Sequence, residues 1–151
     1  MRSYKTFSFF ILLFCISCTK NELSNNPYLD DISFEKIINL NLPQYDNLNF
    51  NGGAVYISSG GIKGLILFNL NNQIMAWEAN CPNQYPSSCS TLEINGVQAV
   101  CNCDEYKYSL ATGQVLSNTN SESYPMKLYY SEKNGSSVRI SNWTTIVLLK
   151  L

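Results

Sequence analysis

Residues 81–104, CPNQYPSSCSTLEINGVQAVCNCD, decide the fold, because they place a hairpin signal between two cysteine-containing boxes. The first box is Cys81-Pro82-Asn83, and the second is Cys101-Asn102-Cys103-Asp104. Apolar residues alternate with polar ones on both sides of Asn95-Gly96, a dipeptide that tolerates the two positive φ angles of a type I′ turn. The stretch therefore predicts a β-hairpin that joins two cysteine loops.

The remainder of the chain from residue 34 onward predicts an all-β fold. Short apolar runs recur with turn signals roughly every 8–12 residues, which is typical of a β-sandwich or barrel. Turn signals occur at 58–61, at Asn71-Asn72 and at Asn134-Gly135. The expected strands outside the hairpin are 37–42, which stops at Pro43, then 54–57, 65–68, 74–77, 128–130 and 138–140.

The first 17 residues have the pattern of a bacterial export signal. Arg2 and Lys5 precede an apolar run over 7–16, which is shorter than the roughly 20 residues that a membrane-spanning helix needs. Ser17-Cys18 resembles a lipoprotein cleavage box, so we expect Cys18 to carry lipid. We expect a flexible tether over 18–33 and a location in the cell envelope, anchored on the periplasmic or the cell-surface side of a membrane.

The charge of the chain argues against a nucleic-acid partner. Without the leader the chain keeps eight of its ten Lys and Arg and all eleven Asp and Glu, a formal net charge of −3. No basic cluster occurs along it, whereas binding to phosphates needs clustered Lys and Arg.

The four cysteines of the boxes, Cys81, Cys89, Cys101 and Cys103, predict disulfides, because an even set in an exported chain is typical of them. A bond between Cys101 and Cys103 is disfavoured, since it would close a strained ring. The other two pairings remain open. A zinc site is not expected, because the spacing lacks the usual C-x2-C knuckle.

No catalytic set emerges, and we expect that the protein is not an enzyme. The chain has no histidine, so it has no Ser-His or Cys-His pair. Asp104 and Glu105 are adjacent carboxylates, but neighbours in an extended segment point to opposite faces. Tyr106 and Tyr108 share a face by the same rule, and packing is the expected role of both.

The two boxes, with Tyr108 and Thr112-Gly113 downstream, resemble the signature of Rieske iron–sulfur domains, C-x-H followed by C-P-x-H-G-S-x-F and T-G. The chain looks most similar to small Rieske-fold lipoproteins of the Bacteroidetes envelope, on its leader, its Gly-rich hairpin near Gly60 and its apolar strand before Cys81. The resemblance implies an antiparallel β-sandwich or barrel base over 34–142 with a small inserted two-loop lobe equivalent to 81–113.

The same resemblance implies a degenerate cluster site. In the family, the first Cys of each box binds one iron and the His of each box binds the other. Cys81 and Cys101 match the Cys positions, while Asn83 and Asp104 stand at the His positions. Neither an amide nor a carboxylate reproduces an imidazole ligand. We therefore expect no cofactor and no bound metal, with a [2Fe–2S] cluster on atypical ligands as the alternative.

The extra cysteine that some Rieske domains carry in each box matches Cys89 and Cys103. The resemblance implies that these two form a disulfide and leave Cys81 and Cys101 to form a second one, with the exchanged pairing as the alternative. It also implies that Tyr124-Pro125 covers the disulfides.

The expected function is that of a non-catalytic, cluster-free envelope lipoprotein, stabilised by disulfides, that acts as a binding or structural module for an unknown partner. Rieske-type electron transfer is the alternative. The apolar tail 143–151 is expected to be an edge strand, or else an exposed patch for a partner.

Overall fold

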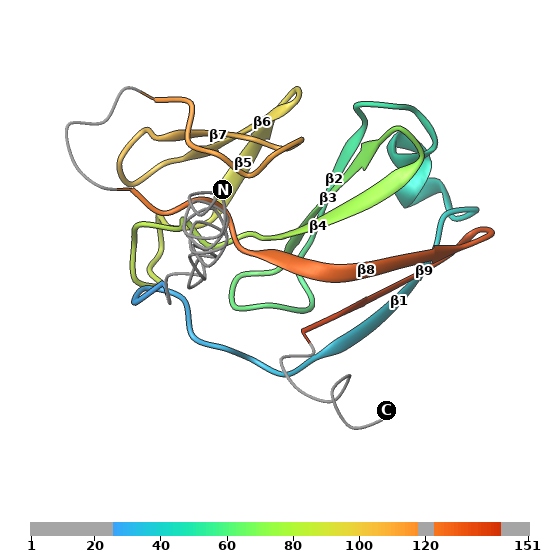
Figure 1. The fold of residues 1–151 in the computed structure, drawn as a ribbon, viewed down its shortest axis with the longest axis horizontal. Helices are drawn as coiled ribbons and strands as arrows, with labels where there is room; N and C mark the ends of the chain where they lie inside the picture. The colour runs from blue at the N-terminus through green and yellow to red at the C-terminus, as the bar shows by residue number, and fades with distance from the viewer. Residues whose placement is uncertain (1–25, 118–122, 143–151) are drawn as a thin grey trace, which may run out of the picture.

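The computed structural model describes residues 26–117 and 123–142, and in these ranges the chain is nearly all β (Figure 1). The export signal, Cys18 and the tail 143–151 lie outside the described residues. The elements in chain order are β1 (Glu35–Asn39), the 3-10 helix η2 (Pro43–Asn49), β2 (Ala54–Ile57), β3 (Leu65–Leu70), β4 (Gln73–Glu78), β5 (Leu92–Asn95), β6 (Gln98–Cys101), β7 (Lys107–Ser109), β8 (Leu128–Asn134) and β9 (Ser137–Ser141).

The base of the fold is a six-stranded sheet in the order β1-β9-β8-β4-β3-β2, with every neighbouring pair antiparallel. β4 and β8 pair only at Ala76↔Tyr129 and Trp77↔Leu128, and the sheet curls so that its two halves enclose a core. A second sheet, β5-β6-β7, forms a small lobe between β4 and β8 in the chain. The prediction of an all-β fold, with an antiparallel β-sandwich or barrel base and a small inserted lobe, is confirmed.

β3 is buried on both faces, which explains its unbroken apolar sequence. Leu65 and Leu67 point into the core of the base, whereas Ile66 and Phe68 belong to a second core shared with the lobe. All four side chains are at most 2% exposed. A strand between two cores has no solvent face, so its sequence shows a continuous run rather than alternation.

The first predicted strand is too long, because the chain leaves β1 at Asn39 and forms η2 instead of extending to residue 42. Leu42 is extended, as the residue before a proline usually is, and Pro43 begins the helix, a position where its missing N–H costs nothing. Tyr45 and Leu48 of η2 fill the core of the base.

The type I′ turn lies at a different dipeptide from the predicted one. Asn71 and Asn72 between β3 and β4 both have positive φ, 51° and 70°. At the β5–β6 hairpin only Gly96 has positive φ, and Asn95 pairs with Gln98. Glycine is thus the first of the two loop residues, as in a type II′ turn.

Part of the expected tether contacts the domain. The Asn26 amide donates to the Pro82 carbonyl at 2.8 Å, Leu29 is buried, and the Asp31 carboxylate pairs with Lys127 at 2.6 Å. The hydrogen bond from Lys127 lowers the pKa of Asp31. Contacts with the domain therefore begin before residue 34. None of the described helices has the length and apolar composition needed to cross a membrane.

A buried carboxylate joins the base to the start of the lobe. Glu78, at the end of β4, is 1% exposed. It accepts hydrogen bonds from the backbone N–H groups of Ile62, Lys63 and Asn80 at 2.7–2.9 Å and from the Tyr129 hydroxyl at 2.6 Å. Burial, and then the neighbouring Glu78 charge, raise the pKa of Tyr129, which keeps this hydroxyl a donor.

We predict that Glu78→Gln lowers the free energy of unfolding by about 2–4 kcal/mol, because the new amide turns a donor toward groups that are themselves donors. Urea unfolding of the unsubstituted chain and of the variant measures the difference. Glu93→Gln is the control, since Glu93 is exposed and accepts a side-chain hydrogen bond from Asn102. Equal stability of both variants would contradict the role assigned to Glu78.

Candidate functional site

The lobe presents the two cysteine boxes at one end of the molecule. β5, β6 and β7 form an antiparallel sheet, and box two is the turn that joins β6 to β7. The Trp77 indole of β4 donates to the Leu110 carbonyl at 2.8 Å. Gly113 lies so close to this ring that a Cβ there would be 2.6 Å from it. The glycine of the predicted Thr112-Gly113 turn thus lets the lobe pack on the base.

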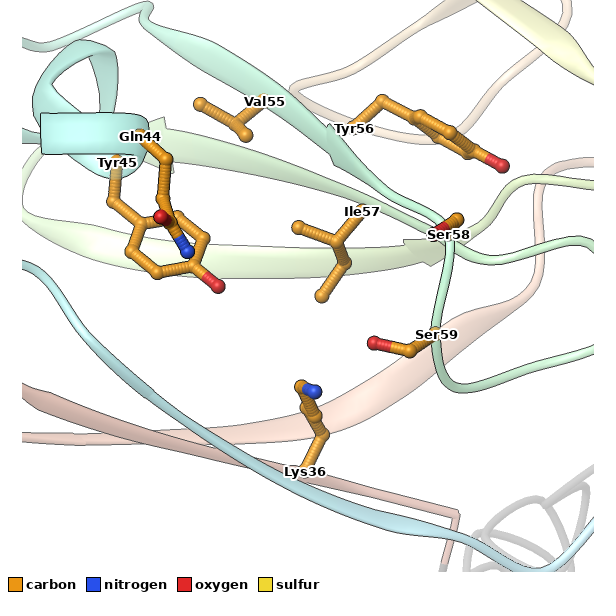
Figure 2. A pocket seen from close by; sticks show the side chains of 8 residues that line it. All are labelled: Lys36, Gln44, Tyr45, Val55, Tyr56, Ile57, Ser58 and Ser59. Atoms are coloured by element: carbon orange, nitrogen blue, oxygen red, sulfur yellow. The ribbon is translucent and has the colours of Figure 1, made fainter. Parts of the chain in front are cut away.

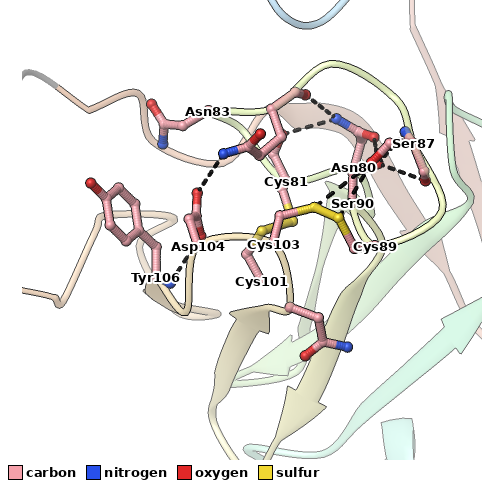
Figure 3. The surroundings of a disulfide bond; sticks show 12 residues. Asn80, Cys81, Asn83, Ser87, Cys89, Ser90, Cys101, Cys103, Asp104 and Tyr106 are labelled. Atoms are coloured by element: carbon pink, nitrogen blue, oxygen red, sulfur yellow. Dashed lines mark hydrogen bonds between the residues drawn. A yellow bond between two sulfur atoms is a disulfide. The ribbon is translucent and has the colours of Figure 1, made fainter.

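Two disulfides tie the boxes together, Cys81–Cys101 and Cys89–Cys103 (Figure 3). This is the pairing that the family resemblance implied. The bonds close loops with sequence separations of 20 and 14 residues, and crosslinks of this span stabilise a fold by about 3 kcal/mol each. Their surroundings differ, because Cys81 and Cys101 are 0% exposed whereas Cys89 is exposed and Cys103 is half-buried.

A buried polar network shapes the loop of box one. The Asn80 side chain, 0% exposed, donates to the carbonyls of Cys81 and Gln84. Its own carbonyl accepts a bond from the Ser90 hydroxyl at 2.7 Å, and that hydroxyl accepts one from the Ser87 N–H. Buried polar groups are stable only when bonded in this way. The network holds Cys81 and Cys89 at opposite ends of a closed loop.

Asn83, at the first position that matches a Rieske histidine, acts as a bridge to a distant loop. Its amide donates to the Tyr108 hydroxyl at 3.0 Å and to the Tyr124 carbonyl at 3.2 Å, and its carbonyl accepts the Tyr124 N–H at 2.8 Å. These bonds bring Tyr124-Pro125 against box one. Tyr108 is buried, and burial raises the pKa of its hydroxyl.

Asp104, at the second such position, closes the turn of box two. Its carboxylate accepts the Tyr106 N–H at 2.9 Å and a bond from the Gln84 side chain at 3.3 Å. Glu105 has a φ of 60°, in the left-handed region, and its N–H bonds to the Cys101 carbonyl. The Gln84–Asp104 bond joins the two boxes beside the disulfides.

These four positions do not fit a Rieske cluster as they are arranged. The Cys81 and Cys101 sulfurs are bonded to each other, and both Asn83 and Asp104 use their polar atoms within the protein. Among the described residues, no group of three or more His, Cys, Asp or Glu side chains is arranged to hold a metal ion.

Tyrosines border the same end of the lobe. Tyr28, from the segment before β1, contacts Tyr85 edge to face with ring centroids 5.0 Å apart, and Tyr124 at 6.0 Å. Tyr85 is 66% exposed. The sequence analysis did not predict this cluster, because its members come from three separate segments. Only Tyr124 was expected near the disulfides.

The sequence matches no family model and no curated protein. Three solved structures are similar in overall fold. They are a complex of reduced oxygenase and oxidized ferredoxin in carbazole 1,9a-dioxygenase (15% identity, 75% of this chain and 95% of that chain, TM-score 0.47), a ferredoxin of Sphingomonas yanoikuyae B1 (16%, 61% and 87%, 0.43) and a putative NADH-dependent nitrite reductase small subunit of Mycobacterium tuberculosis (16%, 76% and 100%, 0.45).

These similarities correct one expectation. The prediction that the protein has no cofactor is contradicted, because two of the three similar structures are described as containing a ferredoxin.

We predict that the two disulfides differ in their access to a reductant. A small phosphine reductant without denaturant is expected to open Cys89–Cys103 first, since Cys81–Cys101 is enclosed by the second core. Timed alkylation followed by peptide mass spectrometry follows each pair. Simultaneous loss of both disulfides in the folded protein would contradict this order, and urea provides the control in which both pairs become accessible.

Proposed function

We propose that the protein is an exported, lipid-anchored β domain that binds a protein partner in the cell envelope through its disulfide-bonded lobe. The observation that carries the proposal is the state of the four positions that match Rieske ligands. Cys81 and Cys101 form a disulfide, and Asn83 and Asp104 make hydrogen bonds within the protein. The lobe therefore has a surface that the two disulfides hold in place. Lipid on Cys18 and an envelope location remain proposals that rest on the leader sequence.

The surface chemistry of the lobe supports a binding role. Exposed aromatic rings are enriched in protein interfaces, because they offer a large apolar area with little loss of rotamer freedom. Tyr85 is exposed beside box one, and its ring packs against Tyr28, which in turn contacts Tyr124. The two disulfides together tie both ends of the 81–89 segment, which carries Tyr85, to box two. The loop is thereby ordered before binding, which reduces the entropy that association costs.

The proposed role is not enzymatic, and it is supported by how the described residues of the lobe use their polar groups. The carboxylate of Asp104, in box two, accepts hydrogen bonds from the Tyr106 N–H and from the Gln84 side chain. The Tyr108 hydroxyl is buried, and its raised pKa keeps it protonated. That hydroxyl is therefore not poised to move a proton near neutral pH.

A second candidate is electron transfer by a [2Fe–2S] protein. It is favoured by Cys81 and Cys101, which match the cluster-binding cysteines of the Rieske signature, and it requires that their disulfide be absent from the working protein. Iron and acid-labile sulfide in stoichiometric amounts, with free thiols at both cysteines, would support this candidate and overturn the first.

The proposed binding role is tested by photo-crosslinking in cells. We predict that a photoreactive phenylalanine at Tyr85 crosslinks the full-length chain to a single envelope protein, and that Cys89→Ala/Cys103→Ala reduces the yield about tenfold or more by releasing the loop. The same photoreactive group at Asn134, on the exposed β8–β9 hairpin, is the control. A yield that is equal at both positions, or unchanged by loss of the disulfide, would contradict the proposal.

The anchor has its own test. We predict that the chain incorporates a labelled fatty acid and fractionates with membranes, and that Cys18→Ser abolishes both properties. Cys15→Ser is the matched control and is expected to leave them unchanged. Membrane fractionation of Cys18→Ser at the unsubstituted level would contradict lipid anchoring through this residue.

A further inference from the structure

A lysine of the edge strand β1 points toward the interior of the base. Lys36 pairs with Ile140 of β9 and lies on the same face of β1 as Ile38. Both isoleucines belong to the core of the base, where they are at most 3% exposed. Lys36 itself is half-buried and forms no ion pair with any described residue. A charge held partly away from water needs compensating polar contacts, so its surroundings indicate what it can bind.

The space that Lys36 faces is a cavity of about 350 Å³ between β1 and β2, the two edges of the six-stranded sheet (Figure 2). Small-molecule sites in proteins have volumes of about 300–1,000 Å³, so this cavity suits a compact ligand. Val55 and Ile57 of β2 supply the apolar part of the lining, and both also pack against the core of the base. The rest of the described lining is polar.

Tyr45 of η2 places a hydroxyl group at this cavity. Its ring packs in the core of the base and the residue is only 6% exposed, while its hydroxyl points into the cavity (Figure 2). Buried tyrosine hydroxyls usually have a hydrogen-bond partner. Tyr129 bonds Glu78 in this way, but the Tyr45 hydroxyl has no such bond within the part of the chain that the structure describes. This hydroxyl is the strongest indication that the cavity takes a polar ligand.

Two further donors border the cavity. The Gln44 amide extends from η2 and the Ser59 hydroxyl from the β2–β3 loop, and Figure 2 shows both turned toward the same space. The loop that carries Ser59 is anchored, because the Glu78 carboxylate accepts the N–H groups of Ile62 and Lys63. The backbone near Ser59 is thus fixed before a ligand arrives, which reduces the entropy that binding costs.

The charge of the lining favours a ligand with a single negative charge. Each polar side chain in the lining can donate a hydrogen bond, and the described lining contains no aspartate or glutamate. Lys36 is the one cation among these described residues. A phosphate monoester would bring a second negative charge without a second cation, and a neutral sugar would leave the ammonium group without a counter-charge.

We propose that this cavity binds a small organic acid with one carboxylate group. The carboxylate accepts hydrogen bonds from the Lys36 ammonium and from the hydroxyls of Tyr45 and Ser59, and charge-assisted bonds of this kind are stronger than neutral ones. The short apolar body of the ligand lies against Val55 and Ile57. The site is built from β1, η2, β2 and the loop after β2, so it does not depend on the partner surface proposed for the lobe.

Titration of the full-length chain, followed by the chemical shifts of backbone amides, tests the site. Butyrate and hexanoate are the probes, and butyramide and hexanamide are their neutral counterparts. We expect saturable shifts at Ile57 and Ser59 with the two acids, with dissociation constants of about 1 mM or tighter. Binding of the amides is expected to be about tenfold weaker or more, because they lack the charge that Lys36 balances.

Lys36→Met is expected to weaken hexanoate binding about tenfold or more. Lys107→Met is the matched control, since it removes an exposed lysine of the lobe and leaves the cavity unchanged. Tyr45→Phe keeps the ring in the core and removes only the hydroxyl, so it serves as the test if Lys36→Met does not fold. We expect this variant to bind hexanoate about fivefold more weakly or less tightly still.

Equal affinity for hexanoate and hexanamide would overturn the proposal, and so would unchanged hexanoate affinity in Lys36→Met or in Tyr45→Phe. An equal loss of affinity in Lys107→Met would also overturn it, because binding would then follow the net charge of the chain. Tighter binding of inorganic phosphate or of glucose than of hexanoate would show that the cavity takes a different class of ligand.

Discussion

The arrangement of this protein depends on one buried carboxylate, that of Glu78. Removing a charge from water costs several kcal/mol unless donors surround it, and here three backbone N–H groups and one tyrosine hydroxyl do so. The donors belong to the β2–β3 loop, to Asn80 just after β4, and to Tyr129 of β8. Packing of these three segments is therefore coupled. Gly61 is part of the same constraint, since a Cβ there would lie 2.5 Å from the carboxylate.

The hydrogen bonds of Glu78 connect the base to the lobe through Asn80. The Asn80 N–H donates to the Glu78 carboxylate just after β4, and the Asn80 side chain donates to the Cys81 and Gln84 carbonyls of the first cysteine loop. The buried Cys81–Cys101 bond joins the start of that loop to β6. The more accessible Cys89–Cys103 bond joins the far end of the loop to box two. The two residues at the positions that match Rieske histidines have structural roles. Asn83 holds a distant loop, and Asp104 closes a turn.

The sequence predicted most of the strands because their signals are local. The apolar run at 65–68 and the hairpin around Asn95-Gly96 both appear as expected. The 3-10 helix was missed, since Pro43 signals a strand end without showing that Tyr45 and Leu48 return to the core. The turn type predicted for Asn95-Gly96 was wrong, because Asn and Gly both tolerate positive φ and the strand register decides which residues occupy the loop.

The candidate site was predictable only in its covalent part. Four cysteines in two boxes, read with the family resemblance, indicated both bonds. The Glu78 network and the tyrosine cluster depend on tertiary neighbours, and no periodicity or spacing indicates them. A buried glutamate at the end of an apolar strand resembles any strand-terminating charge until its donors are known.

Disulfide mapping of the exported, full-length chain under non-reducing conditions tests the central claim most directly. The structure predicts peptides crosslinked through Cys81–Cys101 and Cys89–Cys103, with none of the four as a free thiol. Free thiols at Cys81 and Cys101, or crosslinks between Cys81 and Cys103, would contradict the claim that these two disulfides hold the lobe together.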